Sequence, residues 1–203
     1  MYNHRIKIPQ NTTHLILGAR FNQKIIQKIK IPQNITHLIT DKFFKHKIKI
    51  PQNITHINFN TYKIKIPQNI THLKINITDR MGSNSLLRIS EGIKKNKLIK
   101  IPQNVTHIMY VNYFCDNVPI KIKLSQNITH VYFIGTFNQK IFIPVNIKYF
   151  IIKSEFIYNN IIMPLNIKHL SINKNLLHKI HVPSDTIHVI PNTFNDFLQI
   201  IYK

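Results

Sequence analysis

Apolar and polar residues recur along this chain in one pattern that returns about every 19 residues. The stretch Lys-Ile-Pro-Gln-Asn-Ile-Thr-His-Leu occurs at 30–38 and again, letter for letter, at 65–73. Near copies begin at Ile8, Ile50, Ile101 and Leu124, and weaker copies begin at Ile143, Met163 and Val182. This period lies at the short edge of the roughly 20 to 29 residues of leucine-rich-repeat coils. The pattern therefore predicts a repeat solenoid.

The number of units follows from the spacing of these copies. Nine are visible, and the gap between the copies at 66 and 101 is wide enough for one more. Residues 89–96 keep the apolar positions of the unit, so we expect a degenerate tenth unit there. The chain then forms a single solenoid domain over 1–203 with about ten repeats, and its most irregular part is 74–97.

Within a unit, the alternation of side chains predicts one short strand. Leu38 and Thr40 share one face, and His37 and Ile39 share the other, which is the two-residue period of a strand. Strands of successive units should pair in parallel, about 4.8 Å apart, on the concave side of the coil. The Ile-Pro-Gln-Asn segment makes the corner, because proline needs no hydrogen-bond acceptor and asparagine bonds neighbouring backbone. A ladder of corner side chains is expected from the column Asn11, Asn34, Asn53, Asn69, Asn104, Asn127, Asn146, Asn166 and Asp185.

The segments that lead into the corners alternate lysine and isoleucine, which places isoleucines inside and lysines outside. We expect these return segments to be irregular or extended, and the convex side to be basic. Little helix is expected, except at 191–203. There Phe194, Phe197, Leu198 and Ile201 have helical spacing and predict a short cap on the end of the solenoid.

The charge of the chain is extreme, with 28 lysine and arginine residues against 7 acidic ones and a formal charge of +21. Such a surplus predicts attraction to nucleic acid, anionic membranes or acidic proteins. An AT-rich genome is the competing explanation, since isoleucine, lysine and asparagine abound. Cys115 is the only cysteine, and no secretory signal or membrane-spanning run is present. We therefore expect an intracellular, cytoplasmic protein, in the host cytoplasm if the chain is viral.

The Pro-x-Asn-x-Thr-His unit, together with Phe-Asn-Gln-Lys-Ile at 21–25 and 137–141, resembles the FNIP repeat family. The match is fullest at 8–25, which includes Gly18, and at 124–141, which includes Gly135. That family is similar to leucine-rich repeats and is known chiefly from social amoebae and giant amoeba-infecting viruses. Members often carry an F-box ahead of the repeats, so the resemblance implies a ubiquitin-ligase adaptor with the repeats as substrate receptor. With the first repeat at about residue 8, we expect no F-box here.

One column of the repeat is the candidate concave-face binding site. It consists of His14, His37, His56, His72, His107, His130, Tyr149, His169 and His188. We interpret it chiefly as a structural ladder. Two alternatives are a pH-sensitive surface that becomes cationic near pH 6 and a transition-metal site. A flat, evenly spaced row lacks the clustered geometry that metal sites need, so we predict no metal and no cofactor.

The remaining residues support no catalytic machinery, because acidic residues are scattered and no phosphate-binding loop is present. Two functions from different classes remain. The favoured one is a non-enzymatic scaffold that binds a protein partner. The alternative is a non-specific polyanion binder that uses lysine rows. Those rows contain Lys47, Lys49, Lys63, Lys65, Lys121 and Lys123. The sequence does not identify the partner or the oligomeric state.

Overall fold

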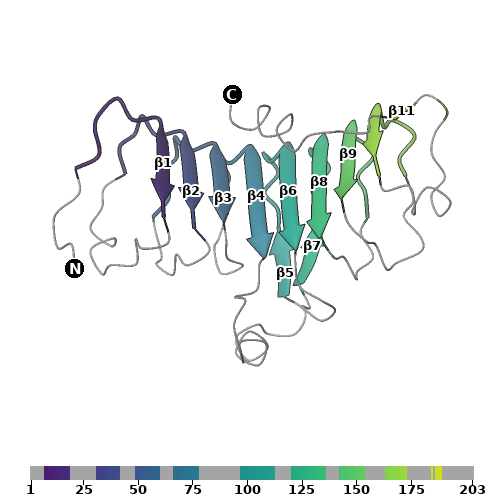
Figure 1. Ribbon diagram of the computed structural model, residues 1–203, viewed down its shortest axis with the longest axis horizontal. Helices are drawn as coiled ribbons and strands as arrows, with labels where there is room; N and C mark the ends of the chain where they lie inside the picture. The colour runs from purple at the N-terminus through teal and green to yellow at the C-terminus, as the bar shows by residue number, and fades with distance from the viewer. Residues whose placement is uncertain are drawn as a thin grey trace.

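The computed structural model describes residues 7–18, 31–41, 49–59, 66–77, 97–112, 120–135, 142–153, 163–172, 184 and 186–188. Over these ranges the chain is a parallel β-solenoid without α-helix, which confirms the predicted fold class (Figure 1). Nine strands form one large sheet, in the order β1-β2-β3-β4-β6-β8-β9-β10-β11. Their bounds are β1 His14–Leu17, β2 His37–Thr40, β3 His56–Phe59, β4 His72–Ile77, β6 His107–Asn112, β8 His130–Gly135, β9 Tyr149–Lys153, β10 His169–Ser171 and β11 Ile187–His188.

The register of the large sheet follows the repeat from β1 to β10. His14 is the Cα partner of His37, and the same column continues through His56, His72 and on to His169. The last pair differs, because His169 pairs with Ile187 and Leu170 pairs with His188. The prediction that His188 continues the histidine column is therefore wrong by one residue. The spacing of the repeat units along the sequence does not reveal this one-residue shift in register.

Each corner is a tight turn that the proline begins. The Ile35 N–H donates to the Pro32 carbonyl at 3.3 Å, and the Val105 N–H donates to that of Pro102 at 3.2 Å. Proline suits this place because its fixed φ matches the turn and its carbonyl remains free to accept. Ser125 replaces proline in one unit, and the turn is kept, with Ile128 N–H to Ser125 O at 3.3 Å.

The predicted asparagine ladder is present from turn to turn. The Nδ2 groups of Asn34, Asn53 and Asn69 donate to the carbonyls of Thr12, Ile35 and Ile54 in the preceding coil. Farther along, Asn104, Asn127 and Asn146 donate to Gln68, Gln103 and Gln126 carbonyls at 2.7–2.8 Å. The accepting carbonyl thus moves two residues toward the proline after the third coil, and the ladder continues. These bonds satisfy backbone groups that the corner removes from the strand ladder.

The core fills the space inside the coils. The residue after each corner asparagine is fully buried in six successive coils, as Ile35, Ile54, Ile70, Val105, Ile128 and Ile147 show. Inward strand residues join them, and Thr40 is buried beside Leu38, as the alternation predicted. Larger rings fill the middle, where Phe133 meets Tyr110 and Phe150 edge to face, with ring centroids 6.2 and 5.9 Å apart.

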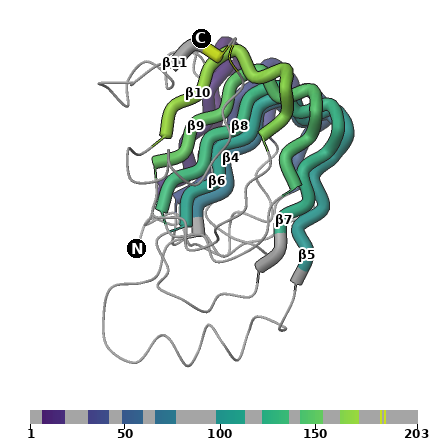
Figure 2. The backbone as a smooth tube through the Cα atoms, turned by 90° about the vertical axis from the view of Figure 1, so that its right-hand side faces the viewer, coloured from purple at the N-terminus to yellow at the C-terminus, as the bar shows by residue number. Residues whose placement is uncertain are grey.

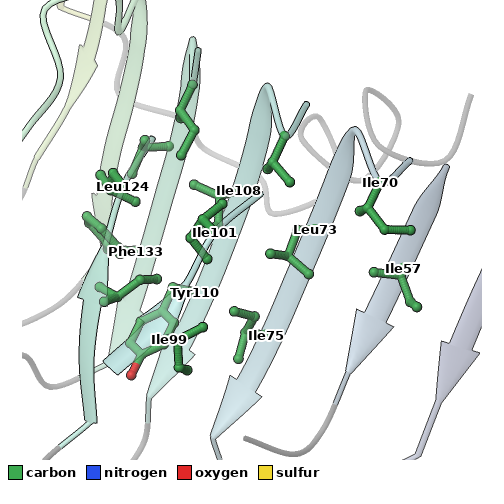
Figure 3. Close-up of a cluster of buried hydrophobic side chains, with 14 of the residues drawn as sticks. Ile57, Ile70, Leu73, Ile75, Ile99, Ile101, Ile108, Tyr110, Leu124 and Phe133 are labelled. Carbon is green, nitrogen blue, oxygen red and sulfur yellow. The ribbon is translucent and has the colours of Figure 1, made fainter. Parts of the chain in front are cut away.

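Two return segments form a second parallel sheet, β5 (Lys97–Lys100) with β7 (Ile120–Lys123). Figure 2 shows β5 and β7 on one arm of the nested coils, with β6, β8 and β9 on the other. Ile99 and Ile122 belong to the same core cluster as Ile101 and Ile108. Figure 3 shows Ile99, Ile101 and Ile108 together in this core. Alternating lysine and isoleucine has the period of a strand, so pairing follows where two such segments lie in neighbouring coils. The return segments were expected to be irregular or extended, and β5 and β7 are extended and paired with each other.

The long interval of sequence between the units at 66 and 101 places no strand between β4 and β6 in the large sheet. β4 pairs directly with β6, in register from His72 with His107 to Ile77 with Asn112. Residues 89–96, which the sequence assigned to a tenth unit, lie outside the described residues. The predicted irregular stretch 74–97 is also shorter than expected, because β4 continues to Ile77 and β5 begins at Lys97. Strand pairing therefore shows nine coils in the large sheet.

Several other predictions fall outside the described residues. These are the helical cap at 191–203, the Phe-Asn-Gln segments at 21–25 and 137–141, Asp185 in the asparagine column, and Cys115. They remain predictions of the sequence.

Gly135 ends β8 in a backbone conformation that other residues rarely adopt. Its φ is +97°, and a Cβ placed there would stand 1.6 Å from the carbonyl oxygen of Asn112. Gly18, at the end of the first coil, has nothing within 4 Å of the equivalent position. Only one of the two glycines that resemble the FNIP pattern is thus required by packing.

We expect Gly135→Ala to lower the free energy of unfolding by about 2–4 kcal/mol, because the methyl group collides with backbone and the φ is strained. Gly18→Ala is the matched control and should change stability by less than about 1 kcal/mol. Urea denaturation followed by circular dichroism measures both. Equal stability of the two variants would contradict the β8–β6 packing described here.

Candidate functional site: the outer face of the large sheet

The outer face of the large sheet is the face turned away from the core. It carries the histidine column and, two residues later in each strand, a second column. The second column consists of Ile16, Ile39, Asn58, Lys74, Met109, Tyr132, Ile151 and Ser171. Strand alternation places both columns on this face, as the sequence predicted.

The rings of the histidine column form one continuous stack. Centroids of successive imidazoles lie 3.9–4.1 Å apart from His14 to His130, with interplanar angles of 13–22°. Tyr149 continues the stack at 4.3 Å from His130 and 4.4 Å from His169. Parallel in-register strands bring identical rings to about the strand spacing, and a small tilt closes the remaining gap. The ladder interpretation of the column is therefore correct in its geometry.

From His14 to His130, a threonine before each histidine sets the imidazole tautomer. Thr36 Oγ lies 2.8 Å from His37 Nδ1 but 3.5 Å from the Thr13 carbonyl oxygen. That carbonyl already accepts two N–H groups, from Thr36 at 2.9 Å and His37 at 3.1 Å. The Thr36 hydroxyl therefore donates its proton to His37 Nδ1 and not to the Thr13 carbonyl. This assigns the proton of the neutral ring to Nε2.

The same arrangement recurs at Thr55–His56, Thr71–His72, Thr106–His107 and Thr129–His130, with Oγ to Nδ1 distances of 2.8–2.9 Å. The outer face therefore carries a row of Nε2–H donors, one in each coil from His14 to His130.

Stacking keeps these imidazoles neutral. Burial, followed by repulsion from neighbouring imidazoles, lowers the pKa of His37, His56, His72 and His107 from 6.5 to about 4. For His130 the pKa also falls to about 4, with burial as the largest cause and His72, Lys148 and His169 adding repulsion. With pKa values of about 4, these five rings stay neutral near pH 6, chiefly because burial penalises the charged form and secondly because neighbouring imidazoles repel it.

A small hollow opens on the outer face over β2, β3 and β4. It has room for about one water molecule, 10 Å³, among His37, His56, His72, Ile39, Asn58 and Lys74. His37 is 8% exposed, and within the described residues its Nε2 has no hydrogen-bond partner. Burial also lowers the pKa of Lys74. The hollow thus combines an unsatisfied N–H donor with a partly desolvated ammonium group.

The middle of the outer face differs from the open surface that the sequence suggested. Met109 and Tyr132 are 0% and 1% exposed, and with Val111 and Ile134 they form a second apolar cluster against which Ile151 packs. By contrast, Ile16 at the β1 end of the same column is 68% exposed. A signal for this burial was present in the sequence. Residues 108–111 and 131–134 are continuous apolar runs, which are typical of strands buried on both faces.

Three of the six lysines in the predicted rows lie within the described residues. Lys49 and Lys123 are exposed, and Lys121 lies in β7. Lys100 is the Cα partner of Lys123 and is also exposed, so two cations stand side by side on the β5–β7 sheet. Lys47, Lys63 and Lys65 lie outside the described residues. Sequence reasoning missed Lys100, although it occupies the same alternating pattern one coil earlier.

The stacked row does not form a metal centre in the described part of the chain, where no three histidine, cysteine or carboxylate ligands converge. Stacked rings direct their Nε2 atoms in parallel, whereas a metal ion needs donors that converge. Within the described ranges, no helix has the length and apolar character needed to span a bilayer.

Comparisons with known proteins return a family match and a structural match. The FNIP repeat model matches residues 2–39, which include part of the stretch on which the resemblance to that family rests. Among solved structures, the chain is similar to the crystal structure of CroV588, described as a novel circular leucine-rich-repeat protein. The identity is 23% and the TM-score 0.49, over 89% of this chain and 28% of that one. This chain thus spans less than a third of that protein. No curated protein matches the sequence.

The depressed pKa values predict an acid-labile fold. Histidines with a folded pKa of about 4 and an unfolded pKa of 6.5 contribute full stability above pH 6.5 and lose it as the pH falls toward 4. We expect the free energy of unfolding to drop by roughly 3–6 kcal/mol between about pH 7 and pH 4.5, a range discounted because most rings keep solvent contact.

Denaturant midpoints measured across this pH range test the prediction. His72→Phe keeps a ring in the stack but removes one titrating group, so its stability should depend less steeply on pH than that of the parent. A parent chain whose midpoint is flat from pH 7 to pH 4.5 would contradict the assignment of neutral rings.

Proposed function

We propose that this chain is a non-enzymatic scaffold that binds a partner protein on the outer face over β1–β4. The observation that carries the proposal is the change along one column, from buried Met109 and Tyr132 to Ile16, which is 68% exposed. An exposed isoleucine beside half-buried Ile39 and the hollow makes a contiguous apolar surface rimmed by polar groups, which is typical of protein interaction sites.

The chemistry of this face favours a partner with hydrogen-bond acceptors. Nε2–H groups of the histidine row and the Lys74 ammonium are donors, while Ile16 and Ile39 supply apolar contact. A peptide edge rich in carbonyl or carboxylate oxygens fits this combination. In the ubiquitin-adaptor arrangement that the FNIP resemblance implies, the same face would serve as the receptor for the captured protein.

The test is a pair of matched apolar-to-charged substitutions. Ile16→Asp should weaken capture of a partner from native cells by about tenfold or more, because it places an unpaired charge in the contact. Leu98→Asp makes the same change on the β5–β7 sheet, where Leu98 is 42% exposed, and should leave capture unchanged. Quantitative mass spectrometry of the captured proteins gives the ratio. Loss with Leu98→Asp and retention with Ile16→Asp would move the site to the other sheet.

We propose polyanion binding as a second candidate function, supported by the exposed pair Lys100 and Lys123 on the β5–β7 sheet and by the charge of +21. Adjacent cations on a regular sheet can contact successive phosphates and release their counterions. Such binding is independent of sequence and falls steeply with salt.

The salt dependence distinguishes this function from the first. Affinity for generic duplex DNA should fall with a log–log slope of about 0.9 per phosphate neutralised. Lys100→Glu combined with Lys123→Glu should lower both the affinity and the slope, whereas Ile16→Asp should change neither by more than a small factor. If the parent chain does not retain DNA even at low salt, genome composition alone accounts for the charge.

A further inference from the structure

The coils that contain β9 and β10 depart from the repeat at two exposed positions each. The residue after the corner proline, or after Ser125 in the coil that lacks it, is glutamine in six coils, namely Gln10, Gln33, Gln52, Gln68, Gln103 and Gln126, all exposed. In the next two coils it is Val145 and Leu165, which are 61% and 80% exposed. Three residues later, the threonine that bonds the histidine ring is replaced by Lys148 and Lys168, both exposed.

These four residues form one surface, the corner patch, defined as Val145, Lys148, Leu165 and Lys168. β9 and β10 are neighbours in the sheet, and the Lys168 N–H donates to the Lys148 carbonyl at 2.9 Å. The two lysines therefore lie on adjacent coils about a strand spacing apart. Each apolar residue lies within about 11 Å of the lysine that follows it, because three residues of chain span no more. Phe142, which is 78% exposed, precedes the patch in the β9 coil.

Neither replacement has a structural reason in the coil. A glutamine side chain is accepted at the corner of six other coils, and an exposed valine or leucine there buries nothing inside the solenoid. The threonines replaced by lysine make a hydrogen bond to the adjacent ring, as Thr129 does to His130. The β10 coil thus gives up the bond that a threonine would make to the His169 ring, and both coils expose apolar side chains in the same place.

From this arrangement we propose that the corner patch binds a short acidic segment of a partner protein that also carries apolar side chains. The lysines supply charge complementarity, and Val145 and Leu165 supply apolar area on adjacent coils. The inference rests on the scaffold function proposed above and adds a second contact, at a corner of the coil and not on the outer face.

An anionic membrane is a poorer fit. Stable attachment needs a broad basic and apolar surface, whereas the corner column of the other described coils is uncharged glutamine and asparagine. The corner patch covers two adjacent coils, which suits a short peptide segment better than a membrane surface.

The repeat itself supplies variants that should fold. Val145→Gln with Leu165→Gln, and Lys148→Thr with Lys168→Thr, restore the residues used by the other coils. The probe is a fluorescent peptide of alternating leucine and glutamate, and its polarisation is measured against a serine–glutamate peptide of equal charge. We expect the parent to bind the leucine–glutamate peptide about tenfold more tightly than the serine–glutamate one.

Each pair of substitutions should have its own signature. Val145→Gln with Leu165→Gln should abolish the preference for leucine, and Lys148→Thr with Lys168→Thr should remove most of the salt dependence. Lys100→Thr with Lys123→Thr, on the β5–β7 sheet, is the matched charge control and should bind the peptide like the parent. Circular dichroism and thermal midpoints confirm that all variants keep the fold.

Three outcomes would overturn the proposal. Equal binding by all variants would show general attraction to a basic protein. Binding to phosphatidylserine vesicles that the combined corner variant loses, without peptide binding, would make the patch a membrane contact. A parent dimer that the combined variant dissociates would make it a contact between copies. Ile16→Asp should bind the peptide normally, so failure of the outer-face function and failure of the corner patch give different results.

Discussion

The structure depends on one hydrogen-bonding arrangement that repeats at the start of β2, β3, β4, β6, β8, β9 and β10. The carbonyl of the residue that precedes one strand accepts the N–H groups of two successive residues in the next coil, as Thr71 O does from Thr106 at 2.9 Å and His107 at 3.1 Å. This pair of hydrogen bonds forms in short and long coils alike, since it spans 16 residues from Thr55 to Thr71 and 35 residues from Thr71 to Thr106. Register is set at the corner, and the loops between corners vary freely around it.

The other columns follow from this register. Once corresponding residues of each coil lie at the strand spacing, the asparagines reach the preceding corner and the histidine rings stack. The core residues after the corner asparagines form a continuous column for the same reason. Burial of the stacked rings, followed by repulsion between them, lowers their pKa, and the bond to the threonine hydroxyl assigns the proton to Nε2. Parallel pairing thus places the same side chain of each strand in one continuous column on the surface of the sheet.

The two proposed contacts lie at positions where the residues depart from the repeat. The outer face is buried at Met109 and Tyr132 and exposed at Ile16, and the corner column changes from glutamine to Val145 and Leu165. A solenoid needs its repeated residues for stability, so an exposed departure is free to serve recognition. Both proposed contacts arise at such departures, one on the sheet and one at the corner.

The sequence by itself determined the repeat, the parallel strands, the corner turns and the asparagine ladder, because each depends on residues within one unit and on identical neighbours. It also placed the histidines on the outer face, since alternation within a strand decides that. Only the tertiary structure decided that β4 pairs with β6 across the long step and that His188 falls out of the column by one residue. The pairing of β5 with β7 likewise required it, whereas the burial of Met109 and Tyr132 already had a signal in the apolar runs 108–111 and 131–134. These features depend on which segments of different coils meet in space, and spacing along one chain does not encode that contact.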